Sequence, residues 1–237
     1  MARTPRHVRS EAATKREGAQ GAKASGAQLA YSRIYKGILE GRLKPGARIT
    51  EASVGREIGL SRTPIREAIR QLEARGLLVH EPHRGMVIPV PDHQMVTELY
   101  QVREALEGTA AAMAATQASP AELELLREII EAGRGCSGAP AELVRNNTIF
   151  HNAVYRAAHN RYLLRTLASL QDSLMLLGRS TLTLEGRATA AFDEHEAIVK
   201  AIAASDEKGA ETAARLHIRA AHKARLKLLF ETEMEAG

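Results

Sequence analysis

Residues 61–76 have apolar positions spaced as in an amphipathic helix. The side chains predicted to face a core are Ile65, Ala68, Ile69 and Leu72. Ser61 suits the N-cap of this helix, and Gly76 directly follows its last periodic residue. The opposite side carries Thr63, Arg66 and Arg70, with Arg62 at its flank. Such a face fits a DNA major groove, where arginine binds guanine or phosphate, although a solvated basic surface is the alternative for an isolated helix.

The flanking patterns favour the DNA-binding interpretation. Apolar periodicity predicts a helix over residues 28–40 and another over residues 51–58, followed by a glycine turn into Ser61. After Gly76, short β-rich runs are predicted to form a hairpin whose tip is residues 81–85. Three helices followed by a hairpin predict a winged helix-turn-helix, with the third helix in the groove.

The remaining chain, residues 92–237, is predicted to be helical almost throughout. The six expected helices cover residues 92–115, 120–132, 141–158, 161–178, 187–204 and 206–234. The predicted fold class is therefore mainly α, with an N-terminal winged helix-turn-helix and a C-terminal all-α six-helix bundle.

Charge divides the chain in the same way. Residues 1–27 carry a net charge of +4, residues 28–91 of +5 and residues 92–237 of −4, within a total of +5 over 237 residues. Because residues 1–27 are rich in Ala, Gly, Arg and Ser, we predict a disordered basic tail there. The positive charge of the front portion indicates an anionic polymer as its partner.

Other compositional features bear on location. The chain has no apolar run near the roughly 20 residues of a membrane span, and its basic N-terminus lacks the apolar stretch of a secretory signal. Cys136 is the single cysteine, so no internal disulfide can form. We therefore expect a cytoplasmic protein without a membrane partner.

Longer motifs resemble known families. The segment LKPGARITEASVGREIGLSRTPIREAIRQLEARGLLVHEPHRGMVI resembles the DNA-binding domain of the GntR family of bacterial transcription regulators. Within it, IGLSRTPIREAI is similar to the pattern of the subfamily with an FCD effector domain, named after the fatty-acid regulator. The segments ELYQVREALEGTAAAMAA and EHEAIVKAI, with NxxFH ending at His151, resemble the shorter six-helix form of FCD.

The resemblance implies particular DNA contacts. They fall on Arg62, Thr63 and Arg66 of the third helix, and on Arg84 and Gly85 of the hairpin tip. The chain departs from the family at Ala52, where many members have an arginine that touches DNA. Either the contact is missing here, or Arg48 or Arg56 replaces it.

Three histidines on three predicted helices are candidate metal ligands. They are His151, His195 and His217, and Asn147 precedes the first by one helical turn. Imidazoles bind zinc, nickel, copper or iron, but scattered histidines are also ordinary core or surface residues. The resemblance to FCD implies that these four residues bind a divalent metal, zinc or nickel first. Glu194 and Glu196 are candidates to orient the imidazoles, with solvated surface as the alternative.

The resemblance also implies a small carboxylate effector near the metal. Arg103 either neutralises that carboxylate or forms a salt bridge with Glu107. The predicted function is a metabolite-responsive repressor, not an enzyme, that binds an inverted-repeat operator in double-stranded DNA as a homodimer. The alternatives are a metal-dependent hydrolase or a non-regulatory ligand-binding module carrying a DNA anchor.

Overall fold

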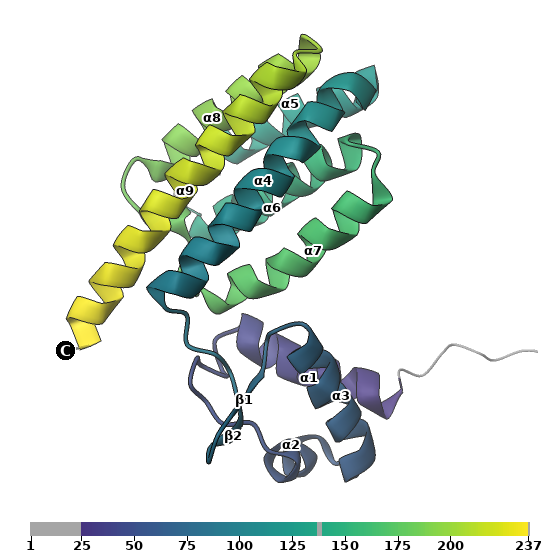
Figure 1. The fold of residues 1–237 in the computed structure, drawn as a ribbon, viewed down its shortest axis with the longest axis vertical. Coiled ribbons are helices and arrows are strands. Elements are labelled where there is room, and N and C mark those ends of the chain that lie inside the picture. The colour runs from purple at the N-terminus through teal and green to yellow at the C-terminus, as the bar shows by residue number, and fades with distance from the viewer. Residues whose placement is uncertain (1–24, 137–138, 237) are drawn as a thin grey trace, which may run out of the picture.

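The computed structural model describes residues 25–136 and 139–236, which form a small N-terminal domain and a helical C-terminal domain (Figure 1). The N-terminal elements are α1 (Gly26–Leu39), α2 (Glu51–Ile58), α3 (Arg62–Ala74), β1 (Val79–Glu81) and β2 (Gly85–Val87). The two strands are antiparallel. This confirms the predicted winged helix-turn-helix with a small hairpin.

Helix α1 begins two residues before the predicted start because Ser25 caps it. The Ser25 hydroxyl accepts from the Gln28 backbone N–H, and the Gln28 side chain accepts from the Ser25 N–H. Gly26 and Ala27 are therefore helical, which corrects the predicted limit of the basic tail. Residues 1–24 of that tail lie outside the described residues.

Helix α3 buries the face that its periodicity predicts. The buried side chains of this helix are Ile65, Ala68, Ile69 and Leu72. The helix ends where Gly76 adopts a φ of +71° and the Leu77 N–H bonds to the Leu72 carbonyl. Leu77 and Leu78 were predicted to begin the hairpin, but both are fully buried in the core ahead of β1.

The loop after α1 anchors the hairpin. The Ile49 N–H donates to the Met86 carbonyl at 2.9 Å, and the Ile88 N–H donates to the Ala47 carbonyl at 3.0 Å. Within the hairpin, Val79 pairs with Val87 and Glu81 with Gly85. Strand β2 therefore has a hydrogen-bonded neighbour on each side, β1 on one and the loop after α1 on the other. These bonds fix the base of the hairpin, and its tip protrudes.

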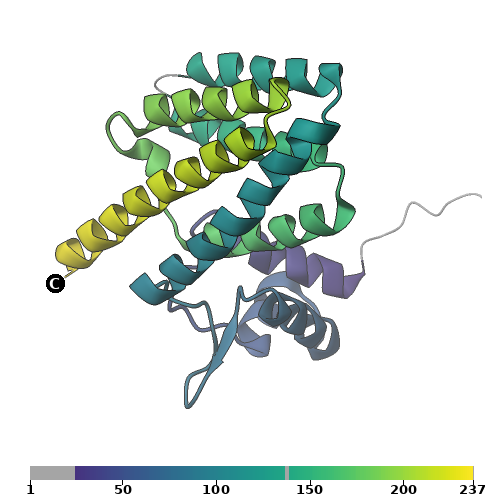
Figure 2. The same cartoon turned by 45° about the horizontal axis from the view of Figure 1, so that its top comes forward.

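The C-terminal domain contains the six predicted helices. They are α4 (His93–Gln117), α5 (Pro120–Arg134), α6 (Pro140–Ala157), α7 (Arg161–Leu176), α8 (Arg187–Ala203) and α9 (Glu207–Ala236), with a short 3-10 turn η1 (Thr181–Thr183) before α8. Helices α4 and α9 lie side by side along most of the domain (Figures 1 and 2). No helix in the described ranges is long and apolar enough to cross a membrane.

Helix α7 of the C-terminal domain packs against the N-terminal domain. Its Leu176 is buried in the hydrophobic core of the N-terminal domain. One turn earlier, the buried carboxylate of Asp172 accepts hydrogen bonds from the Tyr35 hydroxyl at 3.2 Å and from Arg75 at 3.1 Å. Burial and the Asp172 carboxylate raise the pKa of Tyr35 to about 12, so its hydroxyl stays a donor. The C-terminal end of α3 is thus tied to the bundle through Arg75.

We predict that Asp172→Ala lowers the free energy of unfolding by about 1–3 kcal/mol, because Tyr35 and Arg75 lose their shared acceptor. Urea unfolding measures the change. Glu128→Ala, which removes an exposed carboxylate from α5, is the control and should change stability by less than about 0.5 kcal/mol. Equal effects of the two substitutions would contradict the assigned role of Asp172.

Candidate functional site

Three helices bring the predicted histidines together. His151 of α6, His195 of α8 and His217 of α9 are all buried, and one ligand atom of each lies within 4.8 Å of the others. The Nε2 atoms of His151 and His217 are 3.3 Å apart. Residues separated by 44 and 22 positions thus form one compact group of nitrogen donors.

Two carboxylates orient two of the imidazoles. Glu107 Oε2 lies 2.8 Å from His151 Nδ1, and Glu194 Oε2 lies 2.6 Å from His217 Nδ1. A carboxylate at Nδ1 favours the tautomer with its proton there, which leaves the Nε2 lone pair free. Two such lone pairs facing each other at 3.3 Å repel unless a proton or a cation lies between them.

His195 is the third member of the group. Neither of its ring nitrogens has a hydrogen-bond partner among the described residues, although only 1% of the residue is exposed. Its ring stacks on Phe150 with centroids 3.8 Å apart. A buried imidazole with unsatisfied nitrogens beside two oriented imidazoles fits a divalent metal such as zinc or nickel.

Burial favours the uncharged imidazoles of His195 and His217. It lowers the pKa of His217 to about 4, despite the opposing attraction of Glu194. It lowers the pKa of His195 well below the usual range, and neighbouring His217, His151 and Arg187 lower it further. Neutral imidazole is the form that binds a metal, so the surroundings favour ligation near neutral pH.

The other predicted members of the site lie in different places. Asn147 lines a cavity together with His151 and His217, as its position one turn before His151 requires. Of the two glutamates for which orientation of an imidazole and solvated surface were alternatives, Glu194 contacts His217, whereas Glu196 pairs with Arg134 at 2.8 Å on the outside of α8.

The cavity has a volume of about 710 Å³ and lies between the two domains. Its lining from the N-terminal domain includes Tyr35, Leu43 and Lys44, and its lining from the bundle includes His151 and His217. This volume falls in the range of small-molecule sites, 300–1,000 Å³. A molecule bound there would contact both domains.

Arg103 lies in the cavity wall and forms the salt bridge that its spacing from Glu107 allows. Its Nε donates to Glu107 Oε1 at 2.8 Å, and its guanidinium lies over the Tyr100 ring. Burial by itself would raise the pKa of Glu107, but attraction from Arg103 and His151 outweighs it and holds the pKa well below the usual range. Glu107 is therefore ionised and bonded to two cavity residues.

The predicted DNA contacts are exposed on the N-terminal domain. Arg62, Thr63 and Arg66 lie on the exposed side of α3. Because α3 has 13 residues and spans about 20 Å, Arg62 stands far from Arg75 and the bundle. Arg66 donates to both carboxylate oxygens of Glu51, at 2.7 and 3.1 Å.

Arg84 and Gly85 lie at the hairpin tip as predicted. Arg84 donates to Glu81 at 2.7 Å and to the Gly46 carbonyl at 3.0 Å. Gly85 has a φ of +79°, and a Cβ on it would lie 3.8 Å from the Arg48 guanidinium. The structure thus puts Arg48 beside the hairpin, whereas Arg56 stays on α2, bonded to the Ala52 carbonyl.

Two arginines of the cavity wall were missed by sequence reasoning, Arg187 and Arg225. Arg187 precedes Glu194 by seven residues, which places both side chains on one helix face. This spacing could have predicted that Arg187 lies near the histidines. Arg225 meets the cavity because the end of α7 approaches α9, and the sequence has no local signal for that approach.

Comparison with known proteins agrees with this geometry. Residues 98–220 match the FCD domain, and residues 27–88 match the family described as bacterial regulatory proteins, gntR family.

Relatives and solved structures extend these matches. The chain is 31% identical to an uncharacterised HTH-type transcriptional regulator of Bacillus subtilis, YdhC, over 80% of this chain and 84% of that protein. It is 33% identical to a probable D-xylose utilisation operon transcriptional repressor of Paenarthrobacter nicotinovorans, over 79% and 83%. The E. coli McbR/YncC structure has the same fold, with a TM-score of 0.67 and 21% identity over 89% of this chain and 100% of that one.

The metal-free protein should lose stability as the pH falls from about 6.5 to 4.5. His195 and His217 have depressed pKa values when folded, so the unfolded chain binds more protons in this window. Each histidine contributes a slope of up to about 1.4 kcal/mol per pH unit. Urea unfolding in the presence of a chelator should show that the free energy of unfolding changes less steeply with pH in His195→Phe than in the wild type. The exposed His159→Gln is the control, and an unchanged slope in His195→Phe would refute the assignment.

Proposed function

Because this chain belongs to the GntR family of bacterial regulatory proteins and carries an FCD domain, we propose that it is a metabolite-responsive repressor. It is a DNA-binding transcription regulator, and its named relatives are regulators rather than enzymes. The observation that carries the proposal is the cavity that joins the buried histidines to the DNA-binding domain. We propose a cytoplasmic location because the bacterial chromosome lies there.

On DNA, α3 would enter the major groove with Arg62, Thr63 and Arg66, and the hairpin would place Arg84 and Gly85 against the adjacent backbone. The exposure of Arg62, Thr63, Arg66 and Arg84 supports the proposal. Arg48 takes the place of the contact missing at Ala52, since its guanidinium lies beside Gly85.

In the helical domain we propose a divalent metal site, zinc or nickel, formed by Asn147, His151, His195 and His217. Its support is the convergence of the three imidazoles and the unsatisfied nitrogens of His195. A bound metal supplies a Lewis acid that attracts an anionic effector. Glu107 and Glu194 hold their imidazoles in the tautomer that leaves Nε2 free.

The proposed effector is a small carboxylate in the cavity, with Arg103 as one of its partners. Arg103 lines the cavity and is fixed in place by Glu107 and by the Tyr100 ring. An arginine held in this way loses little conformational entropy when it binds a second carboxylate. Effector binding would favour one of two domain arrangements, and the other would bind the operator.

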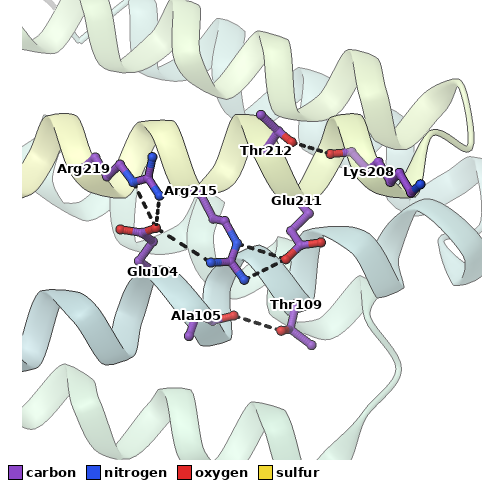
Figure 3. A network of polar contacts seen from close by, with 8 residues as sticks. All are labelled: Glu104, Ala105, Thr109, Lys208, Glu211, Thr212, Arg215 and Arg219. Carbon is purple, nitrogen blue, oxygen red and sulfur yellow. Dashed lines mark hydrogen bonds and ion pairs between the residues drawn. The ribbon is translucent and has the colours of Figure 1, made fainter.

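We further propose a homodimer through the outer face of α4 and α9. There Val102 and Leu216 are 47% and 57% exposed. Between the two helices, Arg219 and Arg215 of α9 reach Glu104 of α4 at 2.7 and 3.7 Å (Figure 3). Exposed apolar side chains and paired charges on these two helices suit an isologous contact that presents two α3 helices to an inverted repeat.

The hydrolase alternative is not favoured. Metal-dependent hydrolysis needs a general base close to the metal. The carboxylates beside the imidazoles, Glu107 and Glu194, are both bonded to them and to arginines. The relatives, moreover, are named transcription regulators.

We predict that Arg66→Ala weakens binding to the operator by about 1–3 kcal/mol if Arg66 contacts a base. Fluorescence anisotropy compares the upstream region of the gene with random duplex at one salt concentration. Arg127→Ala, which removes an exposed arginine from α5, should have no effect. Equal losses on both duplexes would assign Arg66 to phosphate, and no preference of the wild type for any promoter fragment would refute the proposed function.

We predict that the protein retains about one zinc or nickel ion per chain when it is purified without chelators. His195→Ala should weaken metal binding by more than about 100-fold, the upper range for losing only an outer partner of a ligand. Elemental analysis and competition with a chelator measure this, with His159→Ala as the control. A wild-type protein that stays metal-free after zinc or nickel is added would refute the site.

A further inference from the structure

The three arginines in the cavity wall differ in their counter-charges. Arg103 pairs with Glu107 at 2.8 Å, and Arg187 pairs with Glu194 at 2.8 Å. Arg225, in contrast, donates from Nη1 to the backbone carbonyls of Leu177 and Arg179, at 3.0 and 2.7 Å. Among the described residues, no carboxylate lies within ion-pair distance of Arg225.

Arg225 is also buried and incompletely hydrogen-bonded. Only 8% of the residue is exposed, and its Nε has no hydrogen-bond partner in the described part of the chain. Buried charges are normally paired, because removing an ion from water is costly. A guanidinium with neutral partners only, in the wall of a large cavity, therefore fits an anion that comes from outside the chain.

Arg225 and the histidines mark two separate parts of the cavity. His217 and Arg225 are eight residues apart on α9, which separates their backbones by about 12 Å along the helix axis. Both residues line the same cavity of about 710 Å³. A single carboxylate is too small to contact both parts, whereas an elongated molecule with an anionic group at each end is not.

We propose that Arg225 binds a second anionic group of the effector, so that the cavity selects dianions over monoanions. This proposal rests on the proposed effector function of the cavity. One end of the ligand lies at the histidines and Arg103, and the other end at Arg225. The second group is a carboxylate or a phosphate, since a guanidinium forms paired hydrogen bonds with either.

The test compares matched acids by isothermal titration calorimetry on the zinc-loaded full-length protein. Butyrate, hexanoate and octanoate are paired with succinate, adipate and suberate, and gluconate is paired with 6-phosphogluconate. At least one dianion should bind about 10- to 100-fold more tightly than its monoanionic partner, as expected for a charge-assisted hydrogen bond. The ratio of monoanion to dianion dissociation constants is compared between the dicarboxylate pairs and the phosphate pair. The kind of pair with the largest ratio identifies the second group as a carboxylate or a phosphate.

Substitutions assign the preference to Arg225. Arg225→Gln should abolish the dianion preference and leave monoanion binding unchanged, whereas Arg225→Lys, which retains the charge, should keep part of it. Lys227→Gln removes the same charge from an exposed position on α9 and should have no effect. If Arg225→Gln does not fold, the reduction of the dianion preference in Arg225→Lys relative to the wild type tests the role of Arg225 instead.

The outcomes separate this proposal from the proposed function. Monoanions that bind as tightly as dianions, or a dianion preference that survives in Arg225→Gln and is undiminished in Arg225→Lys, would overturn the role of Arg225 while the effector site stands. A protein that binds none of the acids would overturn both.

Discussion

The structure depends on one buried carboxylate at the junction between its domains. Asp172 of α7 accepts hydrogen bonds from Tyr35 of α1 and from Arg75 at the end of α3. A carboxylate that is 6% exposed needs hydrogen-bond donors from the protein, and both of these donors belong to the DNA-binding domain. These hydrogen bonds, together with apolar contacts of Leu176 and Met175 one turn further on, hold the end of α3 against the bundle.

The same helix, α7, also forms part of the cavity wall. Met175 and Leu176 line it, while Leu176 also belongs to the core around α3. The carbonyls of Leu177 and Arg179, just beyond α7, accept from Arg225. A ligand that pulls on Arg225 or displaces α7 would change contacts that hold the DNA-binding domain. Differential contact with two domain arrangements is what effector control requires, and α7 is the element that takes part in both sets of contacts.

How much the sequence predicts depends on the range of the interaction. Periodicity predicts the buried face of α3 and all six bundle helices, because those patterns are local. The histidines were found through resemblance, since residues 44 and 22 positions apart give no local signal. The ion pair of Glu107 and Arg103 was foreseeable from its i,i+4 spacing, but the contact of Glu107 with His151 joins two helices.

The arginines of the two domains differ in the groups that hold their guanidinium in place. Arg66, Arg84, Arg103 and Arg187 are each held by a carboxylate of the chain, namely Glu51, Glu81, Glu107 and Glu194. Such a partner fixes the guanidinium in place but also competes for its donors, so an incoming phosphate or carboxylate gains less than the full interaction. Arg225 has the fixed position without this competition, because backbone carbonyls hold it and carry no net charge. An anion would therefore gain more at Arg225 than at the arginines that already have a carboxylate, which is the physical basis of the proposed preference for dianions.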